Sequence, residues 1–237
     1  MTTLKVLSAG AVKRGVTHVC AAFERDTGSK VEVEFTQAPL LRQRIAAGES
    51  VDVLVATPSA MDEFAAQGKI VPATRALLGR SRVGVVVHKD AAVPDVADTE
   101  AFKRTLTAAS AVVHNSASSG IYVATLLEKL GLKAVLGSKI AVTTSGSAVM
   151  ETVAAHGSGA VGLAQISEIM VMVDKGCAVK LAAPLPDAIQ NVTTYHAAAS
   201  ASAGSAEAAA ALARALTSDA AKKWFAATGI DQACICQ

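Results

Sequence analysis

Residues 111–131 read AVVHNSASSGIYVATLLEKLG and contain a predicted strand, turn and helix in a row. The apolar residues at 111–113 predict a short buried strand, and apolar residues at helical spacing from 121 to 130 predict a helix that stops at Gly131. Ser116, Ser118 and Ser119 can each cap that helix. Backbone N–H groups in such a turn converge at the positive end of a helix, a typical place for an anion, although an ordinary capped turn has the same sequence.

The first third of the chain repeats this strand–turn–helix order. Strands are predicted at residues 4–7, 30–35 and 52–56, and the helices that follow them end at Gly28, Gly48 and Gly68. A helix between two parallel strands requires a right-handed crossover. These units therefore predict a parallel sheet flanked by helices.

The rest of the chain continues the pattern with two interruptions. Strands at 82–88 and 192–198 do not belong to simple strand–turn–helix units, whereas strands at 139–143 and 159–164 do. The alanine-rich segment from 206 to 227 predicts packing helices. We place the crossings between two lobes near 80–84 and 190–195, which predicts lobe 1 at 1–81 plus 195–237 and lobe 2 at 82–194.

Composition limits the classes of partner. The 237 residues are 51% hydrophobic, enough for one large or two small α/β domains with a real core. The net charge of +2 is spread along the chain and aromatic residues make up only 3%, so no nucleic-acid partner is expected. No apolar run is long enough to span a bilayer, so no membrane association is expected either.

The cysteines indicate reduced thiols. Cys20 lies in a helical pattern and Cys177 in a strand that looks buried, where free cysteine is a common small apolar residue. Cys234 and Cys236 lack the neighbours of a metal site. We expect neither a metal nor a cofactor.

The predicted turns after the strands share small residues with hydroxyl or amide groups. They lie at 8–11, 36–38, 57, 115–119, 144–146 and 165–167. In open α/β sheets the ligand binds beyond the carboxyl ends of the strands, where such turns converge. A ring of neutral donors at helix N-termini favours an anion held by dipoles. A nucleotide site or a hydrolase is disfavoured, because the sequence has neither a Gly-Lys phosphate loop, nor a Gly-x-Gly-x-x-Gly turn, nor a Gly-x-Ser-x-Gly elbow.

The order of several short stretches resembles the molybdate-type periplasmic binding proteins, class II of the solute-binding fold, over nearly the whole chain. These stretches are 21–24 (AAFE) with 27–28 (TG), 52–56 (DVLVA), 120–122 (GIY) with 129–131 (KLG), and 159–162 (GAVG). The resemblance implies an α/β fold of two lobes, each a mostly parallel sheet flanked by helices, with two crossing strands as a hinge. It also implies that the ligand binds in the cleft between the lobes.

The chain departs from the molybdate pattern at the ligand. It has Ala11, residues 37–39 (QAP) and Gln165 where molybdate binders carry serines or a tyrosine. The stretches 165–169 (QISEI), 184–186 (PLP) and 189–190 (IQ) are instead similar to a divergent branch of the superfamily. That branch includes aconitate isomerase and substrate-binding proteins without an export signal.

A polycarboxylate needs larger and more cationic donors than molybdate. Lys13 and Arg14 begin the first helix, where cations oppose the helix dipole unless an anion is near, and Arg42 and Arg44 lie one turn into the second helix. Each has a solvated surface charge as its alternative, which we favour for Lys13 and Arg44. The residues expected to contact the ligand are Ser8, Gly10, Ala11, Arg14, Gln37, Ala38, Arg42, Thr57, Asn115, Ser116, Ser118, Ser119, Gly120, Tyr122, Ser145 and Gln165.

An allylic isomerisation needs a base and an acid that act on carbons of the bound substrate. The candidates are His114, which leaves its strand for the turn, and Glu168; the alternatives are a core histidine and a helix-capping carboxylate. The remaining histidines lie outside the predicted turns and are expected to be structural or on the surface: His18, His88, His156 and His196.

Two functions remain. One is a cytoplasmic, cofactor-independent isomerase of unsaturated polycarboxylates, similar to aconitate isomerase. The other is a non-catalytic binding protein for a small anion, of the ABC-transporter type or an intracellular sensor. The N-terminal MTTLKVLSAG enters a strand directly without an export signal, so we expect a cytoplasmic protein. A trimmed signal would make it periplasmic and would imply a transporter as its partner.

Overall fold

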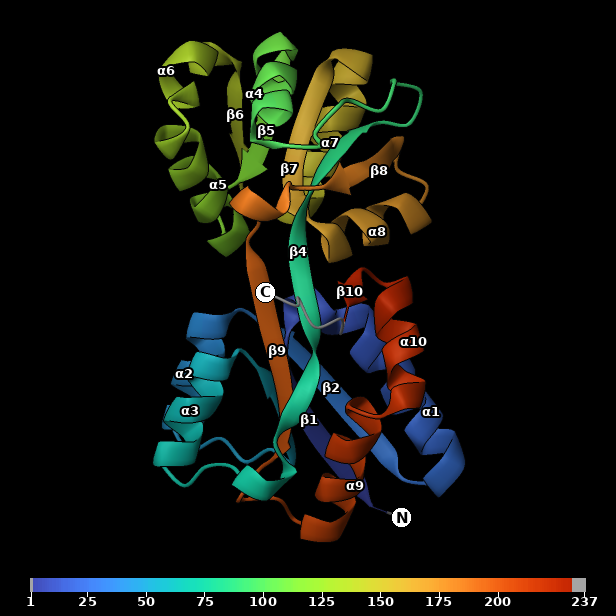
Figure 1. Cartoon of the computed structure of the whole chain (residues 1–237). Coiled ribbons are helices and arrows are strands. Elements are labelled where there is room, and N and C mark those ends of the chain that lie inside the picture. Colours follow the sequence, from blue (N-terminus) through green and yellow to red (C-terminus); the bar gives the residue numbers. More distant parts are fainter. Residues whose placement is uncertain (1, 232–237) are drawn as a thin grey trace. The chain divides into compact units, whose positions relative to one another are not determined.

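The computed structural model describes residues 2–231, except for the side chain of Ser118, and Figure 1 shows the chain. It divides into two compact units: unit 1 comprises Met1–Arg80 and Thr193–Gln237, and unit 2 comprises Ser81–Val192. The chain passes from unit 1 to unit 2 within strand β4 (Ala76–His88) and returns within strand β9 (Val192–Ala199). Cys234 and Cys236 lie outside the described residues.

Unit 1 has a parallel three-strand centre. Strand β1 pairs in parallel with β2 on one side and β3 on the other, and β3 pairs antiparallel with β9. Its remaining elements are helices, the start of β4, and the short strand β10, which pairs with β4. The bounds are β1 Thr3–Ala9, α1 Lys13–Thr27, β2 Lys30–Thr36, α2 Ala38–Ala46, β3 Val53–Ala56, α3 Pro58–Ala66, α9 Ala206–Leu216, α10 Asp219–Ala227 and β10 Ile230–Asp231.

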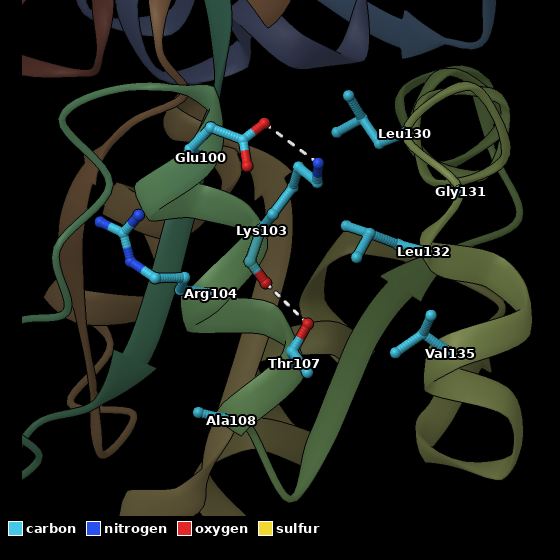
Figure 2. A pocket seen from close by; sticks show the side chains of 9 residues that line it. All are labelled: Glu100, Lys103, Arg104, Thr107, Ala108, Leu130, Gly131, Leu132 and Val135. Atoms are coloured by element: carbon cyan, nitrogen blue, oxygen red, sulfur yellow. Dashed lines mark hydrogen bonds and ion pairs between the residues drawn. The ribbon is translucent and has the colours of Figure 1, made fainter.

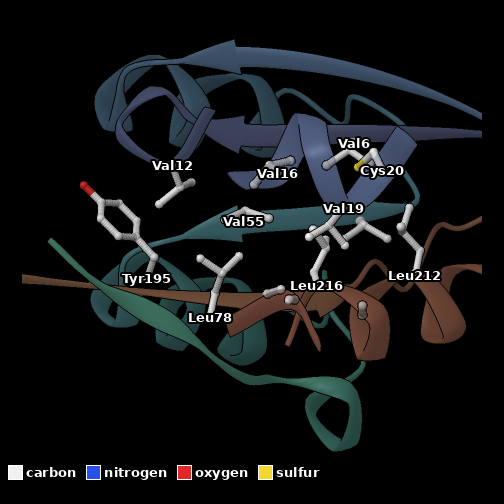
Figure 3. Close-up of a cluster of buried hydrophobic side chains, with 14 of the residues drawn as sticks. Val6, Val12, Val16, Val19, Cys20, Val55, Leu78, Tyr195, Leu212 and Leu216 are labelled. Carbon is white, nitrogen blue, oxygen red and sulfur yellow. The ribbon is translucent and has the colours of Figure 1, made fainter. Parts of the chain in front are cut away.

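Helices cover both faces of the unit 1 sheet. Alternate residues of β1 and β3 pack against α1, α9 and α10 on one face, and Figure 3 shows part of this cluster around Val16, Val55 and Leu216. The other residues of the same strands pack against α2 and α3. Cys20 is buried in the first cluster, and burial raises the pKa of its thiol to about 12. Its predicted role as a small apolar residue is confirmed.

Unit 2 is built in the same way. Strand β5 pairs in parallel with β6 and β7, and β4 pairs antiparallel with β7 and β8. Helices α4, α5 and α6 pack on one face of this sheet, and α7 and α8 on the other. The bounds are α4 Thr99–Ala108, β5 Ala111–Asn115, α5 Ser118–Lys129, α6 Leu132–Leu136, β6 Ile140–Thr143, α7 Gly146–His156, β7 Ala160–Gln165, α8 Ile166–Asp174 and β8 Val179–Pro184.

The elements that the sequence did not predict are short. Helix α6 has 5 residues, too few for a periodic pattern, and starts directly after Gly131, whose φ of 69° ends α5. For strand β8, the sequence placed a buried strand around Cys177 and a loop at Pro184, whereas the strand covers Val179–Pro184, whose alanines have a low strand propensity. Cys177 precedes β8 and is only half-buried, so its predicted place within a buried strand is wrong.

Candidate functional site

The carboxyl ends of β7, β5 and β6 lie side by side at one edge of the unit 2 sheet, because the three strands are parallel neighbours. The backbone N–H of Ser116 donates to the carbonyl of Thr143 at 2.8 Å and ties the ends of β5 and β6 together. The unit 2 residues predicted to form the site therefore cluster at this strand-end edge. They are His114, Asn115, Ser116, Ser118, Ser119, Gly120, Tyr122, Ser145, Gln165 and Glu168.

Asn115 organises the turn between β5 and α5. Its side chain is fully buried, and its Oδ1 accepts hydrogen bonds from the N–H groups of Ala117 at 2.9 Å and Gly120 at 3.2 Å. Its Nδ2 donates to the buried Ser119 Oγ at 3.3 Å. The turn thus holds fewer free N–H donors than the sequence suggested, since an internal amide oxygen already accepts from two of them.

Gly120 is required by this arrangement. A Cβ at position 120 would lie 1.6 Å from the carbonyl oxygen of Asn115 and 2.6 Å from its Oδ1. No side chain fits there without moving the backbone. The role seen for Gly120 is therefore to let the helix start close against β5.

Some of the other polar groups at the unit 2 edge are exposed, and others are already hydrogen-bonded within the chain. Ser116 and Ser145 are exposed, and Ser145 caps α7 by accepting from the N–H of Ala148 at 3.2 Å. Tyr122 donates its hydroxyl to the carbonyl of Ile189 at 2.9 Å, and burial raises the pKa of the phenol. Gln165 is buried and accepts from Ser81 Oγ at 3.3 Å. Ser116 and Ser145 are thus the donors best placed to meet a ligand.

Glu168 lies in the first turn of α8, with its carboxyl group buried against the start of α7. A Cβ at Gly146, the first residue of α7, would lie 2.2 Å from Glu168 Oε2. Gln165 is the N-cap residue of α8, and its backbone N–H favours the ionised form of the Glu168 carboxylate, as in a helix-capping arrangement. Burial nevertheless raises the pKa of Glu168, and Oε2 is a buried oxygen without a hydrogen-bond partner among the described residues. Such a carboxyl group is suited to carry a proton.

His114 is buried at the end of β5, with its Nδ1 2.8 Å from the carbonyl oxygen of Asn115. A carbonyl oxygen only accepts, so Nδ1 carries the proton and the neutral ring keeps Nε2 as an acceptor. Alternation along β5 places His114 on the same face as Val112, in the cluster under α5. The core-histidine alternative and a role as a base are both compatible with this position.

Unit 1 has a corresponding edge at the carboxyl ends of β1, β2 and β3. Ser8 is buried, and its hydroxyl donates to the carbonyl of Ala9 at 3.1 Å, so this donor already has an acceptor in its own strand. Gly10 and Gln37 are exposed, and Gln37 precedes α2 without a side-chain cap bond. The remaining predicted contacts here are half-buried: Ala11, Arg14, Ala38 and Thr57.

Arg42 faces the neighbouring helix. Its Nε donates to Glu63 at 3.1 Å and its Nη2 to Ser59 Oγ at 2.9 Å, both on α3. Arg44 pairs with Glu34 and Glu49, which agrees with the surface charge expected for it. The guanidinium of Arg42 is thus already engaged by a carboxylate of its own chain.

His196 and Arg75 belong to the unit 1 edge and were missed in the sequence. His196 pairs with Ala56, the last residue of β3, and Arg75 Nε donates to His196 Nδ1 at 2.8 Å. His196 lies outside the predicted turns, as expected, but its place in strand β9 puts it beside the carboxyl end of β3. A strand that pairs antiparallel with β3 has its first residues at the carboxyl end of β3. The strand predicted at 192–198 could therefore have indicated His196 as a residue of this edge.

Away from the strand ends, the surface of unit 2 has a pocket of about 520 Å³ between α4 and the α5–α6 turn. Figure 2 shows that Lys103, in its wall, is bonded to Glu100. None of the predicted site residues lines this pocket. Within residues 2–231, no group of three or more His, Cys, Asp and Glu side chains is arranged to hold a metal ion. No helix in the same range is long and apolar enough to cross a bilayer.

Solved structures define the class of protein. The fold is similar to a substrate-binding domain from Clostridium difficile assigned to a molybdenum ABC transporter, with a TM-score of 0.80, 18% identity, and coverage of 98% of this chain and 100% of that one. It is also similar to the periplasmic molybdate-binding protein of Azotobacter vinelandii, with a TM-score of 0.72, 17% identity, and coverage of 98% and 100%. The chain therefore has the α/β fold of the two-lobe solute-binding proteins, as predicted.

Sequence comparison gives the family. Residues 4–231 match the family described as bacterial extracellular solute-binding protein, and the chain belongs to this family. A relative from Pseudomonas sp, named aconitate isomerase, is 30% identical over 229 residues, which are 94% of this chain and 85% of the relative. The predicted resemblance to a molybdate-binding-like family with an aconitate isomerase branch is confirmed.

Proposed function

We propose that the protein binds a small organic polycarboxylate and isomerises it by an allylic proton shift, as an aconitate-isomerase-like enzyme. The observation that carries this proposal is the 30% identity to aconitate isomerase over 94% of the chain. The solute-binding family supports the broader statement that the ligand is a small anion. The strand-end edges, with their helix N-termini and hydroxyl donors, supply the kind of groups that bind carboxylates.

The reaction is a redistribution of one proton. In trans-aconitate, a base removes a proton from the methylene carbon, and the electron pair of that C–H bond becomes part of the new C=C bond. The former vinylic carbon then takes a proton. The conformation in which the former C–C single bond is bound sets the geometry of the new C=C bond, which allows the cis product. Substrate and product have the same atoms and oxidation state, so the step needs only a proton carrier and groups that stabilise negative charge.

Glu168 is the best-placed proton carrier. Burial favours its protonated form more strongly than the Gln165 N–H opposes it, and its Oε2 has no hydrogen-bond partner among the described residues. The start of α7, which lies against its carboxyl group, favours negative charge that develops nearby. His114, with Nε2 as an acceptor, is the candidate for the second proton transfer.

Proton NMR in deuterated water tests the proposal. Purified protein is incubated with trans-aconitate, and we expect cis-aconitate to appear with deuterium on the methylene carbon. Glu168→Gln should slow this conversion by roughly 10²–10⁴-fold, the usual contribution of a general acid or base. The matched control is Glu151→Gln, because Glu151 is exposed on α7 and should leave conversion unchanged.

His114→Ala is compared in the same assay with His156→Ala, because the ring of His156 is exposed and bonds to the carbonyl of Thr152 on its own helix. Loss of conversion in His114→Ala alone supports the second proton transfer at this residue. Equal conversion in Glu168→Gln and wild type would contradict the role of Glu168. An unchanged spectrum without broadened substrate lines would reject the whole proposal.

The family itself favours a second function. The chain belongs to the extracellular solute-binding proteins, so a protein that binds the anion without converting it is the alternative. Broadened aconitate lines without any cis product would support this function. The cytoplasmic location remains our proposal; fractionation of the source cells, with detection by antibody, tests it.

A further inference from the structure

His196 lies in the last row of residues at the strand-end edge of unit 1. It pairs with Ala56, and one residue earlier on β3, Val55 pairs with Ala197. The same row of β1 and β2 ends with the paired residues Ala9 and Thr36. His196 therefore lies beside the carboxyl end of β3, in the same row as the last residues of β1 and β2, and its partner Ala56 directly precedes Thr57 and the start of α3.

Arg75 fixes the orientation and tautomer of His196. Arg75 donates from Nε to His196 Nδ1 at 2.8 Å, and its guanidinium is held by Asp62 Oδ1 at 2.6 Å and by the carbonyl of Pro58 at 3.3 Å. A guanidinium in a protein keeps all its protons and cannot accept. Nδ1 must therefore be the acceptor, and the neutral ring of His196 carries its proton on Nε2.

The Nε2–H group of His196 is available to a ligand. His196 is half-buried, and Nε2 makes no hydrogen bond to any residue within 2–231. It is also not one of the buried polar atoms left without a partner, so it reaches solvent. A donor that is held in place on one side and open on the other is pre-organised for an acceptor.

The charges around His196 keep the ring neutral. Burial lowers its pKa below the usual 6.5, the cations Arg75 and Arg80 lower it further, and only Asp62 opposes them. The ring therefore offers one hydrogen bond and no charge near neutral pH. A fixed neutral N–H donor bonds only to a ligand oxygen that lies at the right distance and in the right direction. A free cation, by contrast, attracts any anion.

We propose that His196 contacts the ligand and donates a hydrogen bond from Nε2–H to one of its carboxylate oxygens, with Arg75 as the residue that positions the ring and Asp62 as the anchor of Arg75. This inference rests on the proposed function, since it takes the ligand to be a polycarboxylate. It adds to that function a specificity-determining donor in unit 1, in a strand where no candidate was expected.

Calorimetric titration with trans-aconitate tests the donor. His196→Ala should weaken binding by about 10-fold or more, the usual loss for a hydrogen bond to a charged group. His196→Gln should recover part of this loss, because its amide N–H₂ reaches close to the position of Nε2. His156→Ala is the matched control and should bind as wild type does, since the ring of His156 is exposed and bonds to a carbonyl of its own helix.

Arg75→Gln tests the positioning role with a readout that a purely structural residue would not move. Without the guanidinium, His196 gains a proton more easily, and an imidazolium attracts carboxylates more strongly. We expect the dissociation constant of Arg75→Gln, divided by that of wild type, to fall as the pH goes from about 7.5 to about 5.5. The ratio cancels the titration of the ligand itself. Long-range ¹H–¹⁵N NMR of wild type should show His196 as the Nε2–H tautomer.

The outcomes separate this inference from the proposed function. If wild type binds trans-aconitate and a folded His196→Ala binds it equally well, His196 is not a ligand contact, while the proposed function stands. An Nδ1–H tautomer, or a ratio for Arg75→Gln that does not change with pH, also overturns the inference, even if His196→Ala fails to fold. If wild type binds neither isomer of aconitate, the proposed function falls and the donor role falls with it.

Discussion

The strand-end edges of the two units are built alike but hold their polar groups differently. In unit 2 the buried Asn115 accepts from two N–H groups of its own turn, and Gly120 lies so close that no side chain fits. In unit 1 the corresponding turn contains Gly10, where a Cβ would meet nothing nearer than the carbonyl of Thr36 at 3.9 Å. The turn after β5 is thus closed by its own side chains, whereas the turn after β1 has open space beside Gly10; we call them the closed and the open edge for this difference.

The two histidines of these edges differ in the same instructive way. His114 donates from Nδ1 to the carbonyl of Asn115, which leaves Nε2 as an acceptor. His196 accepts at Nδ1 from Arg75, which leaves Nε2 as a donor. A neighbour that can only accept fixes the proton on Nδ1, and a neighbour that can only donate fixes it on Nε2. The free nitrogen is therefore an acceptor in His114 and a donor in His196. The neighbour, rather than the histidine, determines which role is possible.

The largest change in stability is expected from a side chain added at Gly120, in the tight turn between β5 and α5. Gly120→Ala would place Cβ 1.6 Å from a backbone oxygen, so the start of α5 must move. We expect the free energy of unfolding of unit 2 to fall by about 3 kcal/mol or more. Urea unfolding followed by circular dichroism measures it. Gly10→Ala is the control, because its Cβ has room and its φ is not positive; a loss equal to that of Gly120→Ala would remove the contrast between the two edges.

Removing the internal acceptor should open the unit 2 turn. Asn115→Ala leaves the N–H groups of Ala117 and Gly120 without their acceptor, and we expect a loss of about 2 kcal/mol in unfolding free energy. The freed N–H groups should then bind an added anion. Trans-aconitate or sulfate should therefore raise the melting temperature of Asn115→Ala more than that of wild type. An equal rise in both proteins would mean that Asn115 does not occupy an anion site.

Much of the fold was predictable because local sequence determines it. The helices end at glycines with positive φ, such as Gly28 and Gly68. The parallel strands are short apolar runs or, in β2, an alternating run. The elements that were missed depend on tertiary context. Helix α6 is too short for periodicity, and β8 is a strand because it pairs with β4 and not because of its residues.

The sequence places the candidate site at the strand ends but does not say which groups there are free to bind. The turn residues Ser116 and Ser145 could be named because parallel strands bring their carboxyl ends together. Which hydroxyl or amide is already bonded inside the chain depends on three-dimensional contacts, as at Asn115 and Ser8. His196 was missed for a similar reason: its partner Arg75 is 121 residues away in the sequence.

Glu168 allows a test of pH dependence in the closed edge. Burial raises its pKa in the folded protein above the usual 4.5, so below that value both states are protonated and folding carries no penalty from this group. Between about 4.5 and the raised folded pKa, unfolding lets Glu168 release its proton, so the free energy of unfolding falls as the pH rises and levels off above the folded pKa. We expect wild type to lose stability relative to Glu168→Gln as the pH rises above about 4.5. A difference that grows towards acid pH would contradict the assignment, and Glu151→Gln should show no trend.

The smallest change in stability and in ligand affinity is expected from substitution of Arg42. The experiment decides whether Arg42, in addition to Arg75, takes part in ligand binding at the open edge. Its guanidinium is bonded to Glu63 and Ser59 on the half-exposed surface of α2 and α3, so Arg42→Gln should cost below about 1 kcal/mol in unfolding free energy. If the pair persists when the ligand binds, Arg42→Gln should also change the dissociation constant for trans-aconitate by less than about 2-fold. Glu63→Gln sharpens the test because it releases Arg42 from its carboxylate. Tighter binding in Glu63→Gln, lost again in the double variant, would show that Arg42 can reach the ligand; unchanged binding in all three would leave His196 as the donor that distinguishes this edge.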